Sequence, residues 1–355
     1  MDNFAFIIHP INPKRDVERK FPLLGKYLPV SAINFLSRLW PPVYISHIEG
    51  IKSQATNKEI EGWFVACPFT PQVMMSLSHH EVYRKIIKTG QLAQKHGAKI
   101  LGLGAFTSVV GDGGITIAKY LDIPVTNGNS YTIAIAVEAI KKAAEVMNIE
   151  LSQATVAIVG ATGSIGKVCA QLLARDVGKI LLLGRRKNAL NDVQLVIAQN
   201  STAQVQISTS LEDLQNADLI IAVSSAVESI IQAHHLKSGA VVCDVARPRD
   251  VSRHVVEKRQ DVLVIEGGMV EVPGDVKFNF NFGFPEKMAY ACMSETMILA
   301  MEQRYESFSL GKDISLERVQ EIARLAKKHG FKLGGFRSFE KPVTQDYIDK
   351  IKSNI

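Results

Sequence analysis

Cysteine is scarce in this chain, and its few copies lie far apart. Four cysteines occur among 355 residues, at positions 67, 169, 243 and 292, and no two of them form a CxxC pair. This pattern argues against a disulfide framework and against a cysteine zinc site. The nine histidines include the pairs His79-His80 and His234-His235 but no HExxH motif. We therefore expect no metal site, and we interpret both histidine pairs as surface residues.

Long apolar runs and targeting signals are also missing. No stretch reaches the roughly 18 consecutive apolar residues that a membrane-spanning helix needs. The N-terminal residues MDNFAFIIHPINPKRD have no basic region before their apolar run, which stops at His9-Pro10, so they do not resemble a secretory signal. No internal repeat or low-complexity segment is visible. We expect a cytoplasmic protein.

The charge is mildly basic. Lysine and arginine outnumber aspartate and glutamate by 41 to 35, which gives a net charge of +6. Such a charge fits a negatively charged partner, for example nucleotide phosphates, coenzyme A or an acidic carrier protein, and it fits equally well a basic surface without a partner. There is no compact basic stripe and no nucleic-acid-binding motif, so we expect no nucleic-acid partner.

The length and the 46% hydrophobic content allow two domains with separate cores. Residues 21–43 form an apolar segment with prolines near both ends. This segment fits a buried helix pair, a lid over an apolar pocket or a membrane-surface segment, of which burial is the favoured interpretation. Residues 59–69 resemble a strand that runs into a proline turn.

From residue 80 onward, helices and strands alternate. The patterns predict helices over residues 80–97, 125–149 and 314–330, with Asn129 or Ser130 as the cap of the second. Continuous apolar strands after residue 150 are typical of a parallel sheet covered on both faces. The candidate strands are residues 154–159, 179–184, 203–208, 217–224, 240–245 and 261–267.

These patterns predict an α/β fold with a Rossmann-type doubly wound parallel sheet. We expect an N-terminal α/β substrate domain over residues 1–135 and an NADP-binding Rossmann domain over residues 136–285. A C-terminal helical segment, residues 286–355, follows and includes Cys292.

A glycine motif follows the first of these strands. Gly160, Gly163 and Gly166 have the spacing G-x-x-G-x-x-G, and a helix is expected to start there. Such glycines permit a tight turn, a close approach of the backbone to a pyrophosphate and close packing of helix on strand. The motif predicts a dinucleotide site, rather than a turn that only packs. Its predicted contact residues are Gly160, Thr162, Gly163, Ser164, Ile165 and Gly166.

The next strand distinguishes NADP from NAD. NAD-binding proteins usually have an acidic residue at its end, which binds the ribose 2′-hydroxyl. Here the strand ends in Gly184-Arg185-Arg186-Lys187, which has no acid and can pair with a 2′-phosphate. We therefore expect NADPH, with Gly184, Arg185 and Arg186 at the cofactor; the alternative is a solvated basic loop.

Two later loops should face the same cofactor, because ligands bind at the carboxyl ends of such strands. Ser224 and Ser225 follow one strand, and Ala246 follows another. Cys243 lies within the second of these strands and is expected in the core.

Several separate segments together resemble the long-chain acyl–acyl carrier protein reductases first known from cyanobacteria, whose relatives include amino-acid and shikimate dehydrogenase-like proteins. The resemblance covers most of the chain from about residue 60. The segments are LGLGAFTSVV (101–110), VTNGNSYTIA (125–134), LSQATVAIVGATGSIG (151–166), VIEGGMVEVPGDV (264–276) and YACMSETMILAMEQRYESFSLGKDISLERV (290–319).

The resemblance implies reduction of a fatty acyl thioester, on acyl carrier protein or coenzyme A, to a fatty aldehyde with NADPH. It implies a cysteine nucleophile in an A-C-x-x-E-T motif, which residues 291–296 match with Cys292 as the catalytic residue. A second family segment, T-G-N-x-x-T, corresponds to residues 127–132. A peripheral contact with a membrane or with an aldehyde-consuming enzyme stays open, as do acyl chain length and oligomeric state.

Local sequence alone does not decide the role of Cys292. A free cysteine on an apolar helix is often a small buried hydrophobic residue. As a nucleophile it would have to reach its thiolate form, and a nearby charged Glu295 would disfavour that form. A helix that begins near Ala289 would bring the cysteine into the first turn, where the helix dipole helps, whereas a start near Phe284-Pro285 would not.

Two other functions fit the sequence less well. One is an NADP-dependent dehydrogenase of a small polar substrate, an amino acid or a shikimate-like acid, which would use lysine and aspartate; Lys119 and Asp122 are candidates. The other is a non-catalytic protein that senses NADP. The apolar segment 21–43 favours a lipid-like substrate.

Overall fold

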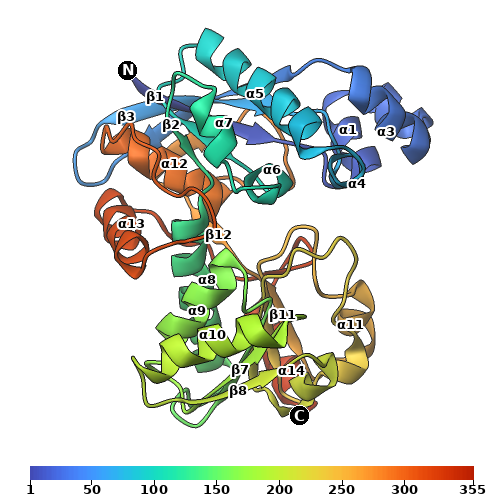
Figure 1. Cartoon of the computed structure of the whole chain (residues 1–355), viewed down its shortest axis with the longest axis vertical. Helices are drawn as coiled ribbons and strands as arrows, with labels where there is room; N and C mark the ends of the chain where they lie inside the picture. Colours follow the sequence, from blue (N-terminus) through green and yellow to red (C-terminus); the bar gives the residue numbers. More distant parts are fainter. The chain divides into compact units, whose positions relative to one another are not determined.

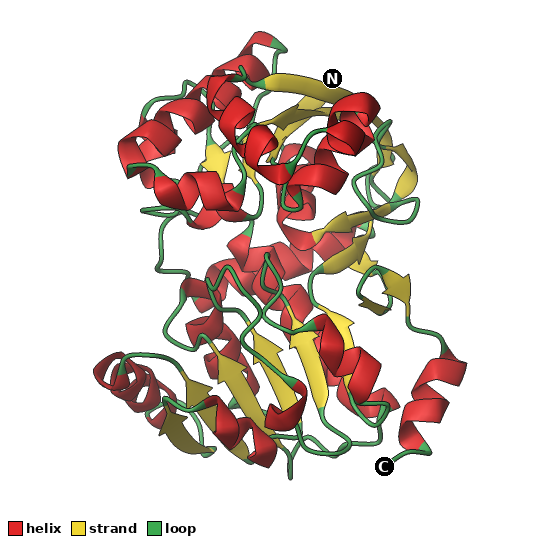
Figure 2. Cartoon of the chain, turned by 90° about the vertical axis from the view of Figure 1, so that its right-hand side faces the viewer, coloured by secondary structure: helices red, strands yellow, loops and turns green.

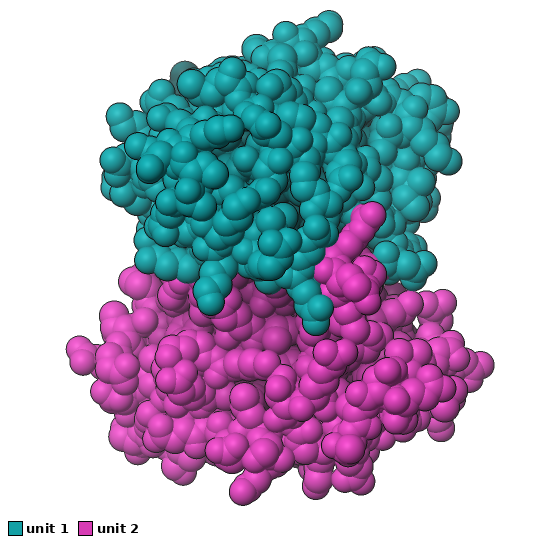
Figure 3. Space-filling view, turned by 90° about the vertical axis from the view of Figure 1, so that its left-hand side faces the viewer, with its two compact units in different colours: residues 1–131, 270–313, 320–332 teal, residues 132–269, 314–319, 333–355 magenta.

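The computed structural model describes all residues, 1–355, and the chain divides into two compact units. Unit 1 comprises residues 1–131, 270–313 and 320–332, and unit 2 comprises residues 132–269, 314–319 and 333–355 (Figure 3). The helices α8 (Asn129–Val146) and α13 (Leu316–His329) contribute residues to both units. The three-part division with boundaries after residues 135 and 285 stays a prediction.

Unit 2 is built on a six-stranded parallel sheet (Figure 2). All five strand pairs are parallel, and the order β8-β7-β6-β9-β10-β11 is the 3-2-1-4-5-6 order of dinucleotide-binding folds. The fold class and the six candidate strands expected from the sequence are confirmed. The strands are β6 (Thr155–Val159), β7 (Lys179–Leu183), β8 (Gln204–Ser208), β9 (Leu219–Ala222), β10 (Val241–Asp244) and β11 (Leu263–Glu266).

The apolar character of these strands follows from burial on both faces of the sheet. Val156 and Ile158 belong to one hydrophobic core, while Ala157 and Val159, which alternate with them, belong to another. Because successive side chains of a strand point to opposite faces, both faces must be covered. The helices of unit 2 include α9 (Ser164–Leu173), α10 (Lys187–Ala198), α11 (Arg253–Lys258) and α14 (Gln345–Lys352).

Unit 1 has its own six-stranded sheet in the order β13-β2-β3-β1-β4-β5. The strands β3, β1, β4 and β5 run parallel, whereas β2 and β13 are antiparallel additions at one edge. From the central β1 the chain goes to β3 on one side and then to β4 on the other. This change of side is a topological switch point, and ligands of open α/β sheets bind beyond the carboxyl ends of the strands there. The strands are β1 (Asp2–Ile8), β2 (Val43–Lys52), β3 (Glu59–Ala66), β4 (Leu101–Leu103), β5 (Val125–Thr126) and β13 (Gly274–Lys277).

The helices of unit 1 include the predicted helix at residue 80, which forms as α5. Its start is fixed by a capping box between Ser78 and Glu81, and it ends before Gly97, whose φ is +86°. Helix α5 spans His79–Lys95, and the other helices are α1 (Pro13–Lys20), α2 (Pro22–Tyr27), α3 (Val30–Leu39), α4 (Pro71–Ser76), α6 (Phe106–Val109), α7 (Ile115–Lys119) and α12 (Ala291–Met301).

One expectation about elements is wrong. Residues 21–43 are not a buried helix pair, because Leu23 and Leu39 are 73% and 72% exposed. The C-terminal part contains the expected helices α12, α13 and α14, together with four short strands: β14 (Met288–Tyr290), β15 (Lys332–Leu333), β16 (Arg337–Ser338) and β17 (Lys341–Pro342). No helix of the chain combines the length and the apolar character needed to cross a membrane.

Candidate active site

Cys292 lies in the first turn of α12. The helix begins at Ala291, after Tyr290 as the N-cap residue, and no side chain accepts a hydrogen bond from its first N–H groups at this cap. The first turn of a helix exposes backbone N–H groups and a partial positive charge. Of the two helix starts considered for Cys292, the structure therefore favours the one in which the helix dipole assists a thiolate.

Helix α12 packs on β1 and β4, the two strands that flank the switch point of unit 1 (Figure 1). The contact is close: a Cβ atom added to Gly102 of β4 would lie 2.2 Å from Oγ1 of Thr296. The helix start reaches the loop that follows β5, where a Cβ atom on Gly128 would lie 2.3 Å from the Cα atom of Cys292. Cys292 is therefore at the carboxyl edge of the sheet of unit 1.

Backbone amides surround the thiol. Hydrogen bonds from the N–H groups of Met293, of Cys292 itself and of Ala105 act to lower the thiol pKa. Ala105 follows β4 and Gly104 in the chain. Its backbone has φ 47° and ψ −123°, a conformation that residues other than glycine rarely adopt. Such backbone strain is found where surrounding structure holds a residue in place, often at functional sites.

His9 holds the residue after Ala105. The N–H of Phe106 donates to Nε2 of His9 at 2.9 Å, and His9 is the first residue after β1. Burial lowers the pKa of His9 to about 4, against a smaller raising effect of the Pro10 carbonyl. The ring is therefore neutral at neutral pH. No sequence motif points to His9; its only sequence signal is a polar residue at the end of an apolar strand.

Burial raises the pKa of the Cys292 thiol to about 12, and the nearby Glu295 carboxyl adds to the effect, while the amides oppose it. The thiol is thus protonated at neutral pH. Cys292 is nevertheless partly exposed, whereas Cys67, Cys169 and Cys243 are fully buried. Burial also raises the pKa of these three thiols, to about 11 for Cys67 and about 12 for Cys169. Cys292 is therefore the one cysteine of the chain that is not fully buried.

Glu295 fastens the loop between β5 and α8 to α12. Its carboxylate accepts hydrogen bonds from Thr126 Oγ1 at 2.5 Å and from the Tyr131 N–H at 2.9 Å. Burial raises the pKa of Glu295, and these hydrogen bonds oppose the rise. Two of the motifs that belong to the family resemblance, residues 127–132 and 291–296, are therefore in direct contact.

The predicted cap of α8 is wrong by a few residues. The helix already includes Asn129, and the side chain that accepts the Asn129 N–H is Oδ1 of Asn127, at 3.1 Å. Ser130 instead shares a hydrogen bond with Ser309 at 2.7 Å between the hydroxyl oxygens. The sequence contains several adjacent cap-forming residues, so only the tertiary partners decide which of them caps the helix.

In unit 2, the glycine motif forms a tight turn between β6 and α9. Gly160 has φ +87°, and a Cβ atom on it would lie 2.9 Å from the carbonyl oxygen of Val223. A Cβ on Gly166 would lie 2.4 Å from the Gly160 carbonyl oxygen. Gly163 is the N-cap of α9 and offers no capping side chain, so the first-turn N–H groups, which begin at Ser164, are available to phosphate. These features fit a dinucleotide; Thr162 and Ile165 lie in the same turn and are half-buried.

The other predicted cofactor residues follow β7, β9 and β10. Because these strands run parallel to β6 in the same sheet, Gly184, Ser225 and Ala246 lie at the same carboxyl edge as the glycine turn. Arg185 and Arg186 are exposed after β7, and Arg186 directly precedes α10.

Ser224 has a hydrogen-bond partner within the protein. Its hydroxyl donates to Oδ1 of Asp250 at 2.5 Å, and its N–H donates to Oδ2 at 2.8 Å. Ala246 donates its N–H to Oδ1 of Asp244 at 3.1 Å. Burial raises the pKa of Asp244 to about 7, against the effect of Arg247. Both the hydroxyl and the N–H of Ser224 are thus engaged within the loop, whereas Ser225 is exposed.

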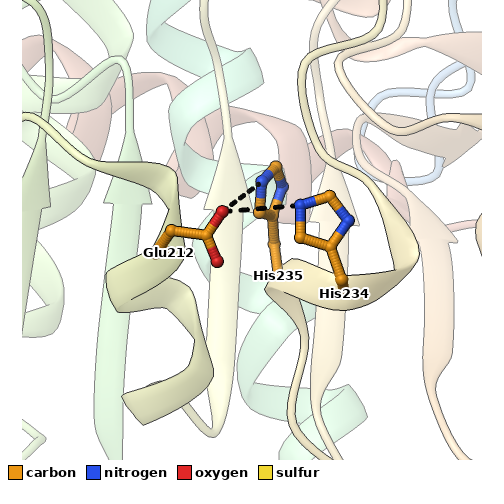
Figure 4. A group of neighbouring side chains, drawn as sticks. All are labelled: Glu212, His234 and His235. Carbon is orange, nitrogen blue, oxygen red and sulfur yellow. Dashed lines mark ion pairs between the residues drawn. The ribbon is translucent and has the colours of Figure 1, made fainter.

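Glu212, His234 and His235 form the one group of three neighbouring metal-type ligands (Figure 4). Oε1 of Glu212 lies 3.5 Å from Nε2 of each histidine. Contrary to the expectation for this pair, His235 is buried. Its Nδ1 accepts the Gln232 N–H at 3.0 Å, which places the proton of a neutral ring on Nε2. A protonated Nε2 has no lone pair for a metal, so the described arrangement of His235 is that of a contact with Glu212.

The fold and the turn between β6 and α9 define a Rossmann-type α/β protein, and comparison with known proteins agrees. The family model Shikimate / quinate 5-dehydrogenase matches residues 141–266. The chain is 29% identical over 306 residues to the long-chain acyl-[acyl-carrier-protein] reductase of Synechococcus elongatus, a match that covers 82% of this chain and 87% of that protein. The resemblance to this family, inferred from the sequence segments, is confirmed.

A second relative is longer. The chain is 31% identical over 304 residues to the aminotransferase PigE of a Serratia species, and the match covers 84% of this chain but only 35% of that protein. The chain thus spans about a third of PigE. Among solved structures, the A chain of dipicolinate synthase from Bacillus subtilis is 15% identical, with a TM-score of 0.35 and coverage of 54% of this chain and 61% of that one. The curated relative and the family model support an oxidoreductase with a nicotinamide cofactor.

Proposed function

We propose that the chain reduces a fatty acyl thioester to a fatty aldehyde with NADPH, through an acyl-enzyme intermediate on Cys292. The observation that carries the proposal is the position of Cys292 in the first turn of α12, next to the N–H groups of Met293 and Ala105. The similarity to the acyl-[acyl-carrier-protein] reductase supports the substrate class. Acyl carrier protein or coenzyme A is the carrier of the acyl group.

In the first step, the sulfur of Cys292 attacks the carbonyl carbon of the thioester. A bond forms between Sγ and the acyl carbon, the bond from that carbon to the sulfur of the carrier breaks, and the proton of Cys292 leaves on the departing thiol. The N–H groups of Ala105 and Met293 are the donors suited to the negative charge that develops on the carbonyl oxygen. Because the thiolate is the attacking form, the Cys292 thiol must lose its proton during the attack, and the N–H groups of Met293 and Ala105 favour the thiolate.

The cofactor would be held by the turn from Gly160 to Gly166, with Arg185 and Arg186 at the 2′-phosphate. When bound, NADPH supplies the hydride that converts the acyl group into an aldehyde. Cys292 takes up a proton when the aldehyde leaves, and its thiol is restored. Because the carrier has already departed, the bulky carrier and the reducing step do not compete for space.

A dehydrogenase of a small polar substrate is the second candidate, and the family model favours it. That match ends at residue 266 and covers the cofactor part of unit 2, so it does not include the residues that would bind a substrate in unit 1. Lys119 and Asp122 are both exposed, and Asp122 accepts a hydrogen bond from Gln94 at 2.8 Å. This pair offers no buried acid–base arrangement.

The deciding experiment is intact mass measurement after the protein is mixed with a long-chain acyl-CoA without NADPH, followed by peptide mapping. The expected result is one acyl adduct on Cys292, which disappears when NADPH is added. With Cys292→Ser, no acyl adduct that disappears on addition of NADPH should form. Cys169→Ala, which changes a buried cysteine of unit 2, should form and lose the adduct as the native chain does. The absence of an adduct with both acyl-CoA and acyl carrier protein, while NADPH still binds, would contradict the proposal.

A further inference from the structure

Helices α2 and α3 expose an unusual number of large apolar side chains. The exposed side chains lie between residues 21 and 39, and Met75 of the neighbouring α4 is also exposed. We call this set the apolar surface; it consists of Phe21, Leu23, Tyr27, Val30, Phe35, Leu39 and Met75. Folded proteins rarely expose such a concentration unless it contacts a partner or a membrane.

The spacing gives each helix one apolar face. Leu23 and Tyr27 are four residues apart on α2 and are 73% and 70% exposed. Phe35 and Leu39 are four residues apart on α3 and are 65% and 72% exposed. Residues four apart lie on the same face of a helix. The exposed faces of both helices therefore include large apolar side chains where a soluble surface would be polar.

These exposed side chains belong to an ordered part of unit 1. Asn34 Nδ2 of α3 donates to Gln72 Oε1 at 3.1 Å, and Arg38 donates to the hydroxyl of Ser76 at 3.1 Å, which ties α3 to α4. Helix α2 packs against α1 so closely that a Cβ atom on Gly25 would lie 2.3 Å from the Cα of Glu18. The helices α1, α3 and α4 lie together in unit 1 (Figure 1).

All charges within the segment are positive. Lys26 and Arg38 are its only charged residues between positions 21 and 43, and both are exposed. The wider segment 13–43 has six basic and two acidic residues, whereas the whole chain has a net charge of +6. Much of the excess positive charge of the protein is therefore located in this segment.

We propose that the apolar surface docks on an anionic lipid bilayer, with its apolar side chains at the level of the acyl boundary and Lys26 and Arg38 among the headgroups. Interfacial helices with an apolar face and basic flanks bind membranes in this way, and binding grows with buried apolar area and with anionic lipid. An acidic protein partner would satisfy the charges but leave most of this apolar area without a matching surface. The proposal does not depend on the reaction, because the surface requires no substrate to bind.

The test is sedimentation of the full-length protein with phosphatidylcholine vesicles that contain either no phosphatidylglycerol or about a third of it. We expect binding to the anionic vesicles, weaker binding at high salt and little binding to the neutral ones. Lys26→Glu/Arg38→Glu should weaken the partition at least about twentyfold, since each cation contributes about fivefold. Phe35→Ser/Leu39→Ser should weaken it at least about tenfold through lost apolar burial.

The matched control is Leu195→Ser/Val196→Ser, which removes two exposed apolar side chains from α10 in unit 2. It should bind vesicles within about twofold of the native chain. Unchanged circular dichroism and NADPH binding would show that the surface variants are folded. Equal binding of all variants, or no binding to anionic vesicles, would overturn the proposal. The proposal would also be overturned if the protein does not bind vesicles but self-associates, or binds an acidic carrier protein, and the surface variants abolish that association.

Discussion

Gly128 and Cys292 touch through their backbones: a Cβ atom on residue 128 would lie 2.3 Å from the Cα and the Cβ of Cys292. Gly128 also has φ +75°, which favours glycine. We predict that Gly128→Ala displaces the start of α12, lowers the free energy of unfolding by about 2 kcal/mol or more and slows acylation of Cys292. Urea unfolding and the rate of adduct formation measure these effects.

Gly97→Ala separates the two causes in that prediction. Gly97 has φ +86° but nothing within 4 Å of its added Cβ atom, so the substitution brings strain without a collision. It should cost about 1 kcal/mol and leave the acylation rate unchanged. If the two variants were equally stable and equally fast, the close approach at Gly128 would have no role in the site.

Glu295→Gln should make Cys292 more reactive and the fold less stable. The carboxylate raises the pKa of the thiol, so its removal should increase the rate of alkylation by iodoacetamide at pH 9 about threefold to tenfold. The amide can accept only one of the two hydrogen bonds from Thr126 and Tyr131, so stability should fall by about 1–3 kcal/mol. Thr126→Ala is the control, because it removes a hydrogen bond and leaves the charge. An unchanged alkylation rate in Glu295→Gln would refute the electrostatic effect.

Arg185→Ala/Arg186→Ala should weaken NADPH binding about tenfold to a hundredfold and leave NADH binding unchanged, because only NADPH has the 2′-phosphate. Fluorescence titration with both cofactors measures the difference. Arg175→Ala, at an exposed arginine beyond the C-terminal end of α9, is the matched control. An equal loss of affinity for NADPH and NADH would mean that the two arginines do not bind the 2′-phosphate.

The stability of the protein should fall in acid because of His9. The folded pKa is about 4 and the ordinary value is 6.5, so between these values the unfolded chain binds a proton that the folded chain does not. Stability should therefore drop as the pH falls from 6.5 to 4, by about 3 kcal/mol in total. His9→Asn, whose side chain can still accept the Phe106 N–H, should show a shallower dependence in urea unfolding. Identical pH profiles would mean that His9 is not buried as a neutral ring.

The strands of unit 2 could be predicted from the sequence because burial on both faces forces continuous apolar runs such as residues 179–184. The glycine turn was predictable for a similar reason, since its conformation excludes other residues at Gly160. In contrast, the sheet of unit 1 pairs β2 with β13, from opposite parts of the chain, and no local pattern encodes such a pairing.

The surroundings of Cys292 could not be predicted either, because they too depend on contacts between distant parts of the chain. The sequence marks residues 127–132 and 291–296 separately, but their contact depends on the buried carboxylate of Glu295, which bridges more than 160 positions. His9 lies in no motif, and the sequence of the segment 101–110 does not reveal the positive φ of Ala105. The apolar segment 21–43 was noticed, but apolar composition does not tell a buried helix from an exposed one.

The interruption of unit 1 between residues 131 and 270 has a consequence for biosynthesis. A ribosome that has completed the first 131 residues has made β1, β3, β4 and β5 but not α12, which covers β1 and β4. Until α12 is made, β1 and β4 of unit 1 lack the helix that covers them, and the whole sheet of unit 2 is synthesised during that time. Helix α12 arrives together with Cys292, so the nascent chain closes this core and acquires the proposed nucleophile in the same event.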